Sequence, residues 1–259
     1  MSASRPAVII LAGGAGTRMN SPLPKVLHPI CGQTMLDYVL AAARELDPSS
    51  IIVVVGHGRD QVISHLSKHA PDVQVVVQDR QGGTGHAVRT VIEETGLATG
   101  TVVVTYGDAP VLRGQTLAAL VSQHSERHAT ATALTTVMDD PTGYGRIIRD
   151  GDGALLEVIE EADATAEQRA ITEVNSGVYA FEAGLLADCV KRLLTDNAKG
   201  EEYLTDVLAV MRADGHDVAT MLAPDPLEVV GVNDQAQLAR ARQIINDRTA
   251  VPEQGAHPQ

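Results

Sequence analysis

The sequence AVIILAGGAGTRM, residues 7–19, decides the fold. Its first part, Ala7–Leu11, is a short apolar run typical of a strand buried on both faces of a sheet. The glycine-rich segment Leu11–Met19 follows directly. Ligands of open α/β sheets bind at the carboxyl ends of strands, where glycines let backbone N–H groups approach a phosphate. Arg18 and Lys25 add positive charge, so this segment predicts an anion site.

Two familiar phosphate-binding loops do not match this segment. The chain has no GxxxxG followed by Lys-Ser/Thr, which excludes a Walker A loop. The spacing of Gly13, Gly14 and Gly16 is not GxGxxG, the dinucleotide-binding pattern. The local pattern alone is also compatible with a tight turn between a strand and a helix that binds no ligand.

Apolar runs alternate with amphipathic segments along the rest of the chain. This alternation predicts an α/β fold, Rossmann-like, with a mostly parallel sheet and helices on both faces. After residue 140 the sequence is rich in strands, and a hairpin around DGDG predicts a β-rich insertion beside the main sheet. The predicted strands are 7–11, 51–55, 73–77, 101–105, 129–138, 145–149, 154–160, 174–181, 218–222 and 227–230, and the predicted helices are 35–46, 60–69, 86–94, 114–128, 182–194, 203–214 and 235–248.

Composition excludes several classes of protein. The net charge of −13 argues against a nucleic-acid partner, which requires a basic face. No apolar run is long enough for a membrane span, so we expect a cytoplasmic protein. With no Trp and one Phe, the core must consist of Val, Ile, Leu and Ala.

The glycine-rich segment and the PKVLHPICGQTML that follows it resemble the signature of the sugar-phosphate nucleotidyltransferases. The form PKVLH looks most like the uridyltransferase domain of the bacterial bifunctional enzymes that make UDP-N-acetylglucosamine. The resemblance spans residues 5–248 and includes, in order, QDRQGGTGHAV, YGDAPVL, PTGYGRI, IEEADAT, EVNSGVYAF, NAKGEEYLTD and GVNDQAQLA.

This resemblance implies the nucleotide-diphospho-sugar transferase fold, with the insertion as a sugar-side wall. It implies a nucleotidyltransferase domain over residues 1–248 and a mobile tail over 249–259. The bifunctional enzymes continue into a β-helix of hexapeptide repeats, which this sequence lacks. We therefore expect no acetyl transfer, and a monomer or weak homo-oligomer.

The reaction implied by the resemblance joins UTP and N-acetylglucosamine 1-phosphate to give UDP-N-acetylglucosamine, a peptidoglycan precursor used in cell wall biogenesis, and pyrophosphate. The sugar phosphate is already ionised at neutral pH, so no general base is required. Arg18 and Lys25 are implied as catalytic residues, and Asp108 and Asn233 as Mg²⁺ ligands. Asp108 and Asn233 are also compatible with helix caps.

Two pockets are implied by the resemblance. Without it, GGTGHA is a helix-opening turn, Glu160 a solvated hairpin charge, and Tyr203 and Thr205 residues that pack against and cap a helix. The nucleotide pocket contains Leu11, Ala12, Gly13, Gly14, Gln78, Gly83, Thr84 and Tyr106, and the sugar pocket contains Gly145, Glu160, Asn175, Tyr203, Thr205 and Asn233.

The sequence departs from the family pattern at two positions in these motifs. Ala15 replaces the usual basic residue of the glycine loop, and Asp234 replaces a common Asn. Phosphate charge must then rest on Arg18, Lys25 and the metal. Two alternatives stay open: the same reaction class with glucose 1-phosphate and UTP or dTTP, and a homologue that binds nucleotide without turnover.

Overall fold

The structure is a computed structural model that describes residues 5–250. The strands are β1 (Ala7–Ala12), β2 (Pro29–Ile30), β3 (Gln33–Thr34), β4 (Ser50–Val55), β5 (Gln74–Val77), β6 (Thr101–Tyr106), β7 (Ala131–Val137), β8 (Arg146–Arg149), β9 (Leu155–Ile159), β10 (Glu173–Glu182) and β11 (Val218–Leu222). The α-helices are α1 (Met35–Arg44), α2 (Arg59–His69), α3 (Thr84–Thr95), α4 (Gly114–Arg127), α5 (Ala166–Arg169), α6 (Ala183–Cys189), α7 (Asp206–Ala213) and α8 (Gln235–Ala250). Short 3₁₀ helices are η1 (Thr17–Met19), η2 (Lys25–Leu27), η3 (Val190–Arg192) and η4 (Pro226–Val229).

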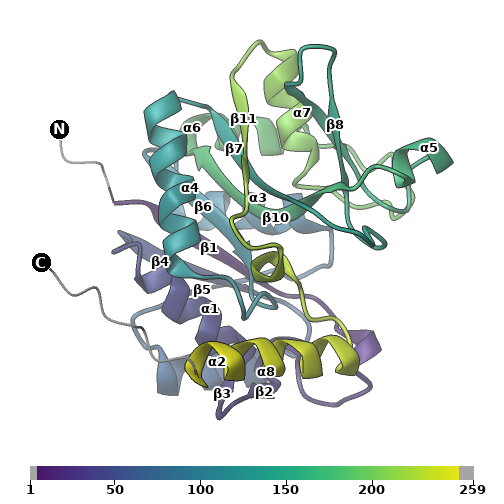
Figure 1. Ribbon diagram of the computed structural model, residues 1–259. Coiled ribbons are helices and arrows are strands. Elements are labelled where there is room, and N and C mark those ends of the chain that lie inside the picture. The colour runs from purple at the N-terminus through teal and green to yellow at the C-terminus, as the bar shows by residue number, and fades with distance from the viewer. Residues whose placement is uncertain (1–4, 251–259) are drawn as a thin grey trace, which may run out of the picture.

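A nine-stranded sheet organises the molecule, and its main path runs β11-β7-β10-β6-β1-β4-β5. β1 is parallel to both of its neighbours, β4 and β6, and β5 is parallel to β4. β10 enters antiparallel between β6 and β7. This mostly parallel sheet, covered by helices, confirms the predicted α/β fold class (Figure 1).

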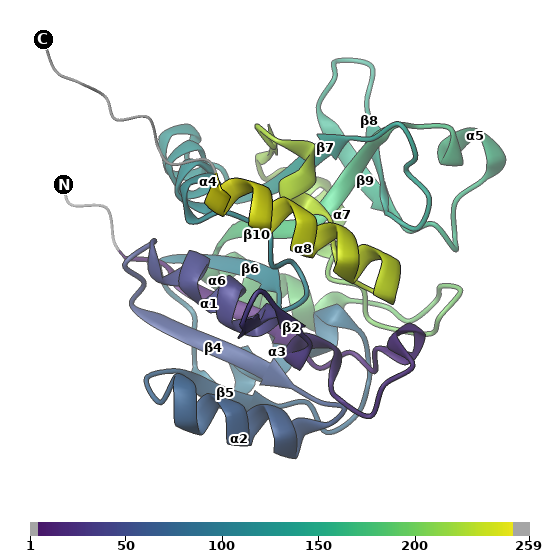
Figure 2. The same ribbon diagram turned by 60° about the horizontal axis from the view of Figure 1, so that its bottom comes forward.

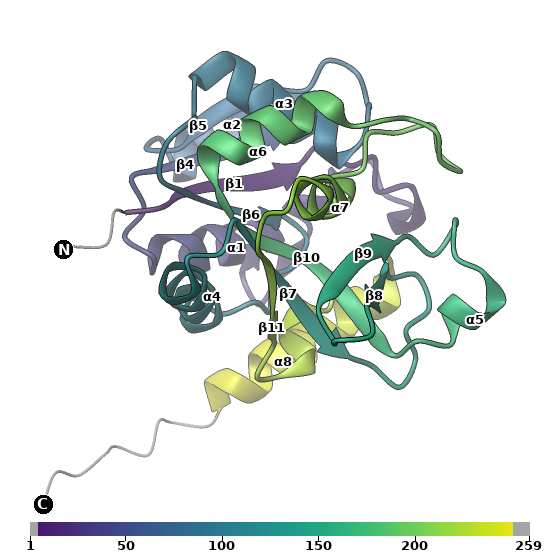
Figure 3. The ribbon, with the colours of Figure 1, turned by 90° about the horizontal axis from the view of Figure 1, so that it is seen from above.

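The core lies on both faces of the sheet because β1 is buried along its whole length. Val8 and Ile10 pack on one face with residues of α1, α2 and α4. Ile9 and Leu11 pack on the other face with residues of α3, α6 and α7. Figure 3 shows α3, α6 and α7 on the opposite side of the sheet from α1 and α4. Successive side chains of a strand point to opposite faces, so an all-apolar run satisfies both layers.

Helix α8 forms a third apolar cluster outside these layers. Leu238 and Ile245 pack there with Met19 and Met35. Figure 2 shows α8 lying across the molecule close to the β2–β3 hairpin. The helix therefore returns the last described part of the chain to the end of the glycine loop. It runs to Ala250, two residues beyond the predicted helix end, and most of the predicted tail, 251–259, lies outside the described residues.

The predicted insertion is a hairpin of β8 and β9, joined to the main sheet through β10. It extends away from the parallel strands beside α5 (Figure 1). Among the described residues, no helix combines the length and apolar character that a membrane crossing requires.

The predicted strand at 227–230 was wrong, because this segment forms the 3₁₀ helix η4. Pro226 occupies the first turn, and the Asp225 carboxylate accepts a hydrogen bond from Leu227 N at 3.0 Å. A proline with fixed φ after a capping Asp favours a helical turn over a strand. The buried Glu228 carboxylate then pairs with Arg113, which fixes the turn against the start of α4.

The loops after β1 and β4 touch backbone to backbone, which gives a stability test. His57 N donates to Gly13 O at 3.1 Å, and a Cβ added to Gly56 would lie 2.9 Å from that oxygen. We expect Gly56→Ala to lower the free energy of unfolding by about 1–3 kcal/mol, the usual cost of overpacking. Gly151→Ala is the matched control, since its added Cβ meets no atom within 4 Å. Urea denaturation measures the free energy of unfolding of both variants. Equal values for Gly56→Ala and Gly151→Ala would contradict the close contact at Gly56.

Candidate active site

Two adjoining cavities open at the carboxyl end of the parallel strands. The strand order reverses beside β1, with β4 on one side and β6 on the other, and a crevice forms at such a switch point. The larger cavity, about 300 Å³, contains all eight residues predicted for the nucleotide, together with Lys25, Asp108 and Asn233. The smaller, about 180 Å³, contains Gly145, Glu160, Asn175 and Asn233. Tyr106, Asp108 and Asn233 line both cavities.

The three glycines of the loop serve different purposes. Gly13 lies against Gly56 and the Gln78 side chain, where an added Cβ would be only 3.2 Å from Gly56 N. Gly14 faces open space. Gly16 has φ of +59°, and its missing side chain leaves room for Lys25, whose Cβ would lie 2.7 Å from an added Cβ. The loop therefore bends so that Lys25 turns into the crevice.

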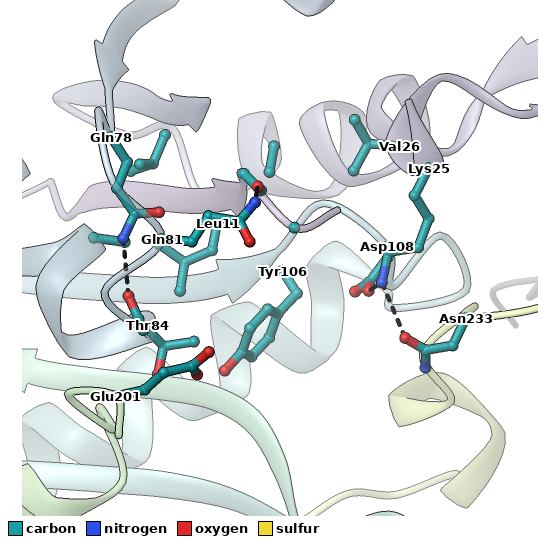
Figure 4. Close-up of a pocket in the computed structure, with 16 residues that line it drawn as sticks. Leu11, Lys25, Val26, Gln78, Gln81, Thr84, Tyr106, Asp108, Glu201 and Asn233 are labelled. Atoms are coloured by element: carbon teal, nitrogen blue, oxygen red, sulfur yellow. Dashed lines mark hydrogen bonds and ion pairs between the residues drawn. The ribbon is translucent and has the colours of Figure 1, made fainter. Parts of the chain in front are cut away.

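Lys25, Asp108 and Asn233 come together from distant parts of the sequence. The Lys25 ammonium forms an ion pair with Asp108 Oδ2 and donates to Asn233 Oδ1 at 3.0 Å. The Lys25 and Asp108 side chains are only 12% and 15% exposed. Figure 4 shows both oxygen-bearing side chains directed towards the end of Lys25. A carboxylate and an amide oxygen thus face one position that already holds a cation.

The helix-cap alternatives for Asp108 and Asn233 do not describe this geometry. Asp108 lies well before α4, and its backbone oxygen accepts a hydrogen bond from Val232 N at 2.9 Å. Asp234 caps α8 instead, because its carboxylate accepts from Gln237 N at 2.8 Å. The Asn233 side chain is therefore left to face the crevice. The departure at Asp234 keeps the cap, since Asp and Asn cap helices about equally well.

A fixed amide forms one wall of the larger cavity. Gln78 Nε2 donates to Gly83 O at 3.0 Å and to His86 Nδ1 at 2.9 Å. Burial, with the nearby Arg80 charge as a second cause, lowers the pKa of His86, which keeps its ring nitrogen available as an acceptor. Gly83 has φ of +100°, which strongly favours glycine. The turn that opens α3 is thereby tied to the end of β5.

Tyr106 stands between the two cavities. Burial, and then the charges of Glu160 and Asp108, raise the pKa of Tyr106 above its ordinary value. Its ring packs so closely on Gly177 that a Cβ there would lie 2.2 Å from Tyr106 Cε2. In Figure 4 the ring reaches towards Thr84 and Glu201. The residue is therefore a fixed, neutral phenol in the wall between the cavities.

The smaller cavity carries groups suited to hydroxyl recognition. Glu160 is half-buried, not a solvated hairpin charge, and burial raises its pKa. Asn175 Nδ2 donates to Tyr179 Oη at 2.7 Å, and its Oδ1 accepts from Gly177 N at 3.2 Å. Asn175 N donates to Gly145 O at 2.8 Å, which joins the two walls. A carboxylate and an amide at fixed positions can bind a polyol.

Three predicted site residues lie outside the two cavity linings. Tyr203 and Thr205 are buried, with Tyr203 near the Lys199 ammonium at 5.8 Å. Thr205 Oγ1 donates to Glu160 Oε1 at 3.5 Å and makes no cap of α7, so it contacts the carboxylate without lining either cavity. Arg18 is exposed on η1. The roles predicted for all three stay predictions.

Sequence reasoning missed five residues that line the larger cavity: Val26, Val54, Gln81, Ala87 and Glu201. Gln81 Nε2 donates to Gly13 O at 3.3 Å, which links the segment after β5 to the glycine loop. Glu201 lies within the matched motif NAKGEEYLTD, two residues before Tyr203, which the resemblance did select. The motif was thus a usable signal for Glu201, whereas the apolar residues carry none beyond strand and helix pattern.

A partly buried ion pair, Arg89 with Glu202, joins two segments that carry residues of the larger cavity. Arg89 Nη2 lies 2.7 Å and 2.9 Å from the two carboxylate oxygens of Glu202. The Glu202 backbone also pairs with the α3 turn, through Glu202 N to Gly82 O and Gly85 N to Glu202 O, both 2.8 Å. The segment with Glu201 and Tyr203 is therefore fastened to the turn with Gly83 and Thr84.

A doubly covered sheet whose switch-point crevice is lined by a glycine loop, a lysine, a carboxylate and an amide is the arrangement of a nucleotide-binding α/β domain. A family model described as the MobA-like NTP transferase domain matches residues 8–178, and the chain belongs to this family. It is 55% identical over 253 residues to the "Bifunctional protein GlmU" of Thermobifida fusca, covering 96% of this chain and 52% of that protein. The protein of the same name from Streptomyces coelicolor is 53% identical over 251 residues, with the same coverages. The chain spans about half the length of the curated relatives it matches.

Asp206, the first residue of α7, provides a pH-dependent test of the site's electrostatics. Burial, and then the charges of Asp163 and Glu157, raise its pKa from 3.8 to about 6. An acid whose pKa is higher in the folded state favours folding below its unfolded pKa, and that contribution is lost as pH rises through about 6. We expect Asp206→Asn to raise the free energy of unfolding by about 1–2 kcal/mol at pH 8.

Urea denaturation at pH 8 and pH 4 measures this effect, and the gain should shrink to a small part of its pH 8 value at pH 4, where the carboxyl is protonated in the folded state and close to half protonated in the unfolded state. Asp196→Asn, at an exposed position, should change stability at neither pH. A gain of equal size at both pH values would show that charge on Asp206 is not the cause.

Proposed function

We propose that this chain joins UTP to N-acetylglucosamine 1-phosphate, releasing pyrophosphate and forming UDP-N-acetylglucosamine, a peptidoglycan precursor. The observation that carries the proposal is the meeting of two cavities at Asp108 and Asn233, with Lys25 between them. A nucleotide in the larger cavity and a sugar phosphate in the smaller one bring their phosphates to this junction. Similarity to proteins named GlmU, at 46–55% identity, supports the same reaction.

The chemistry required is direct attack of a phosphate oxygen on the α-phosphorus. A sugar phosphate loses its second proton at a pKa of about 6, so it is nucleophilic at neutral pH. Among the described residues lining the two cavities there is no histidine and no cysteine. The site instead offers backbone amides of the glycine loop and the Lys25 ammonium, which suit positioning and charge stabilisation.

Magnesium is the proposed cofactor. Asp108 and Asn233 offer one carboxylate and one amide oxygen around a point where the Lys25 ammonium already stands as a cation. In the described part of the chain, no three His, Cys, Asp or Glu side chains group as metal ligands. Two protein oxygens leave positions for phosphate oxygens and water, a pattern that Mg²⁺ prefers. When bound, the ion would neutralise phosphate charge as pyrophosphate leaves.

Uracil is the proposed base, because the edge of the larger cavity combines a fixed Gln78 amide with the Gly83–Thr84 backbone. Uracil presents two acceptors and one N–H donor, which amide groups can match. Gly13 lies beside the same amide, since a Cβ added to it would be 3.3 Å from Gln78 Oε1. Thymine presents the same hydrogen-bonding groups as uracil, so dTTP is the comparison nucleotide in the assay of this proposal.

Pyrophosphate release tests the proposal directly. The chain is supplied with Mg²⁺ and with UTP or dTTP, each with N-acetylglucosamine 1-phosphate or glucose 1-phosphate. We expect the highest kcat/KM with UTP and N-acetylglucosamine 1-phosphate. A preference for another pair would support the related-transferase alternative. Nucleotide binding without release for any pair would support a non-catalytic homologue.

Lys25→Ala tests the phosphate role of the lysine. Loss of one preorganised donor should lower kcat/KM by about 10²-fold or more. Lys68→Ala, at an exposed position on α2, should leave the rate unchanged. Steady-state pyrophosphate release measures both variants. A Lys25→Ala enzyme with wild-type kinetics would remove this residue from the mechanism.

Asp108→Asn tests the metal site. The substitution keeps an oxygen but removes the charge that attracts a divalent cation, so the Mg²⁺ concentration for half-maximal rate should rise roughly tenfold or more. Asp234→Asn is the matched control, because Asn keeps the α8 cap and leaves Asn233 in place. Calorimetric titration with Mg²⁺ and UTP gives a second readout. Identical metal titrations for Asp108→Asn and wild type would exclude Asp108 as a ligand.

A further inference from the structure

Arg146 is the largest side chain that is completely enclosed, at 1% exposure. A buried guanidinium is costly unless its donors are satisfied. Here Nε and Nη2 each donate to Arg169 O at 3.3 Å, and Nη1 donates to Tyr144 O. Nη2 also donates to Glu161 Oε2 at 2.6 Å, which supplies the counter-charge. The side chain therefore joins three separate segments of the hairpin wall.

The register of the sheet places Arg146 directly behind the smaller cavity. As the first residue of β8, it pairs with Ile159 of β9 and with Val174 of β10. The residue before Arg146, the residue after Ile159 and the residue after Val174 form the next row of the sheet, and all three line the cavity. Because successive strand residues point to opposite faces, these residues and Arg146 lie on opposite sides of the wall. The three cavity residues are Gly145, Glu160 and Asn175.

The same contacts of Arg146 determine the spacing between Gly145 and Glu160 in the smaller cavity. Tyr144 and Glu161, both bound by Arg146, are the chain neighbours of Gly145 and Glu160. The gap between those two residues is narrow, since a Cβ added to Gly145 would lie 3.4 Å from Glu160 Oε1. A shift of Tyr144 or Glu161 would therefore move the neighbouring residue that lines the cavity.

We propose that the Arg146–Glu161 pair is a positioning element that determines how well the site selects an N-acetylated hexose 1-phosphate over a plain hexose 1-phosphate. This inference rests on the proposed function. An extra N-acetyl group is accepted only if its hydrogen-bonding partners and the room beside them are held in place. Arg146 holds them without touching the substrate.

Arginine is specifically suited to this position. Its planar fork reaches acceptors in several directions, whereas a lysine ammonium is a single point at the end of a flexible stem. We therefore expect Arg146→Lys to keep the charge but loosen the wall. Glu161→Gln is the milder variant, because Glu161 is 32% exposed and glutamine preserves its shape.

The experiment measures KM and kcat for UTP, N-acetylglucosamine 1-phosphate and glucose 1-phosphate in each variant. We expect KM for N-acetylglucosamine 1-phosphate to rise roughly fivefold in Glu161→Gln and roughly tenfold or more in Arg146→Lys, the scale of weakening a charge-assisted hydrogen bond. KM for UTP and kcat should change less than twofold. The ratio of kcat/KM for N-acetylglucosamine 1-phosphate to that for glucose 1-phosphate should fall by a similar factor.

Arg149, the last residue of β8, pairs with Glu173, the first residue of β10, and Arg149→Lys and Glu173→Gln are the matched controls. Both substitutions weaken an ion pair in the same wall, in which Arg149 Nη2 lies 2.5 Å from Glu173 Oε1. Both controls should keep the wild-type KM for the sugar phosphate and the wild-type preference.

A folded Glu161→Gln enzyme with unchanged sugar KM and preference would overturn the positioning role, even if Arg146→Lys failed to fold. A parallel loss for UTP and sugar phosphate would also overturn it, because general destabilisation would then explain both. Absence of turnover in the wild type would overturn the proposed function together with this inference.

Discussion

The rest of the structure depends on the parallel pairing of β1 with strands on both of its sides. Residues Val8 to Leu11 lie opposite residues 51–54 of β4 and 103–106 of β6. Parallel neighbours require crossover connections, and these connections cover both faces with helices. A strand enclosed in this way must be apolar throughout, and its carboxyl end must open into the crevice. The glycine loop stands there because the chain has to leave the sheet at that edge.

Long-range backbone bonds then bring the walls of the crevice to this edge. Gly107 N donates to Leu11 O, and Val232 N donates to Asp108 O, both at 2.9 Å. Gly85 N donates to Glu202 O at 2.8 Å. Backbone bonds of this kind fix the chain without using side chains, so the side chains of Asp108 and Asn233 stay directed into the crevice. These backbone hydrogen bonds connect the walls of the two cavities. The hairpin wall of the smaller cavity is held separately, by the hydrogen bonds of Arg146 to Tyr144, Glu161 and Arg169.

Local pattern predicted most of the fold, because apolar runs such as IIVVV fit only a doubly buried strand. It failed at 227–230, where the proline and the capping Asp225 outweigh the apolar residues. The site was predicted through motifs, and every residue chosen for the nucleotide lines the larger cavity. Contacts such as Arg89 with Glu202, 113 residues apart, lie beyond local pattern, since only the folded chain brings them together. The same holds for Thr205, whose link to Glu160 is visible only in three dimensions.

Under the proposed function, the balance of charge in the crevice favours a cation in addition to Lys25. The described residues lining the two cavities include one ammonium, Lys25, and three carboxylates, Asp108, Glu160 and Glu201. Ala15 adds no charge at the position where the family resemblance implies a basic residue, and the whole chain carries a net charge of −13. A triphosphate would enter against this excess, at a cost that a low-dielectric site magnifies. It follows from the proposed function that a divalent ion between Asp108 and Asn233 would release Lys25 towards the phosphates, so metal and lysine together replace the charge missing at Ala15.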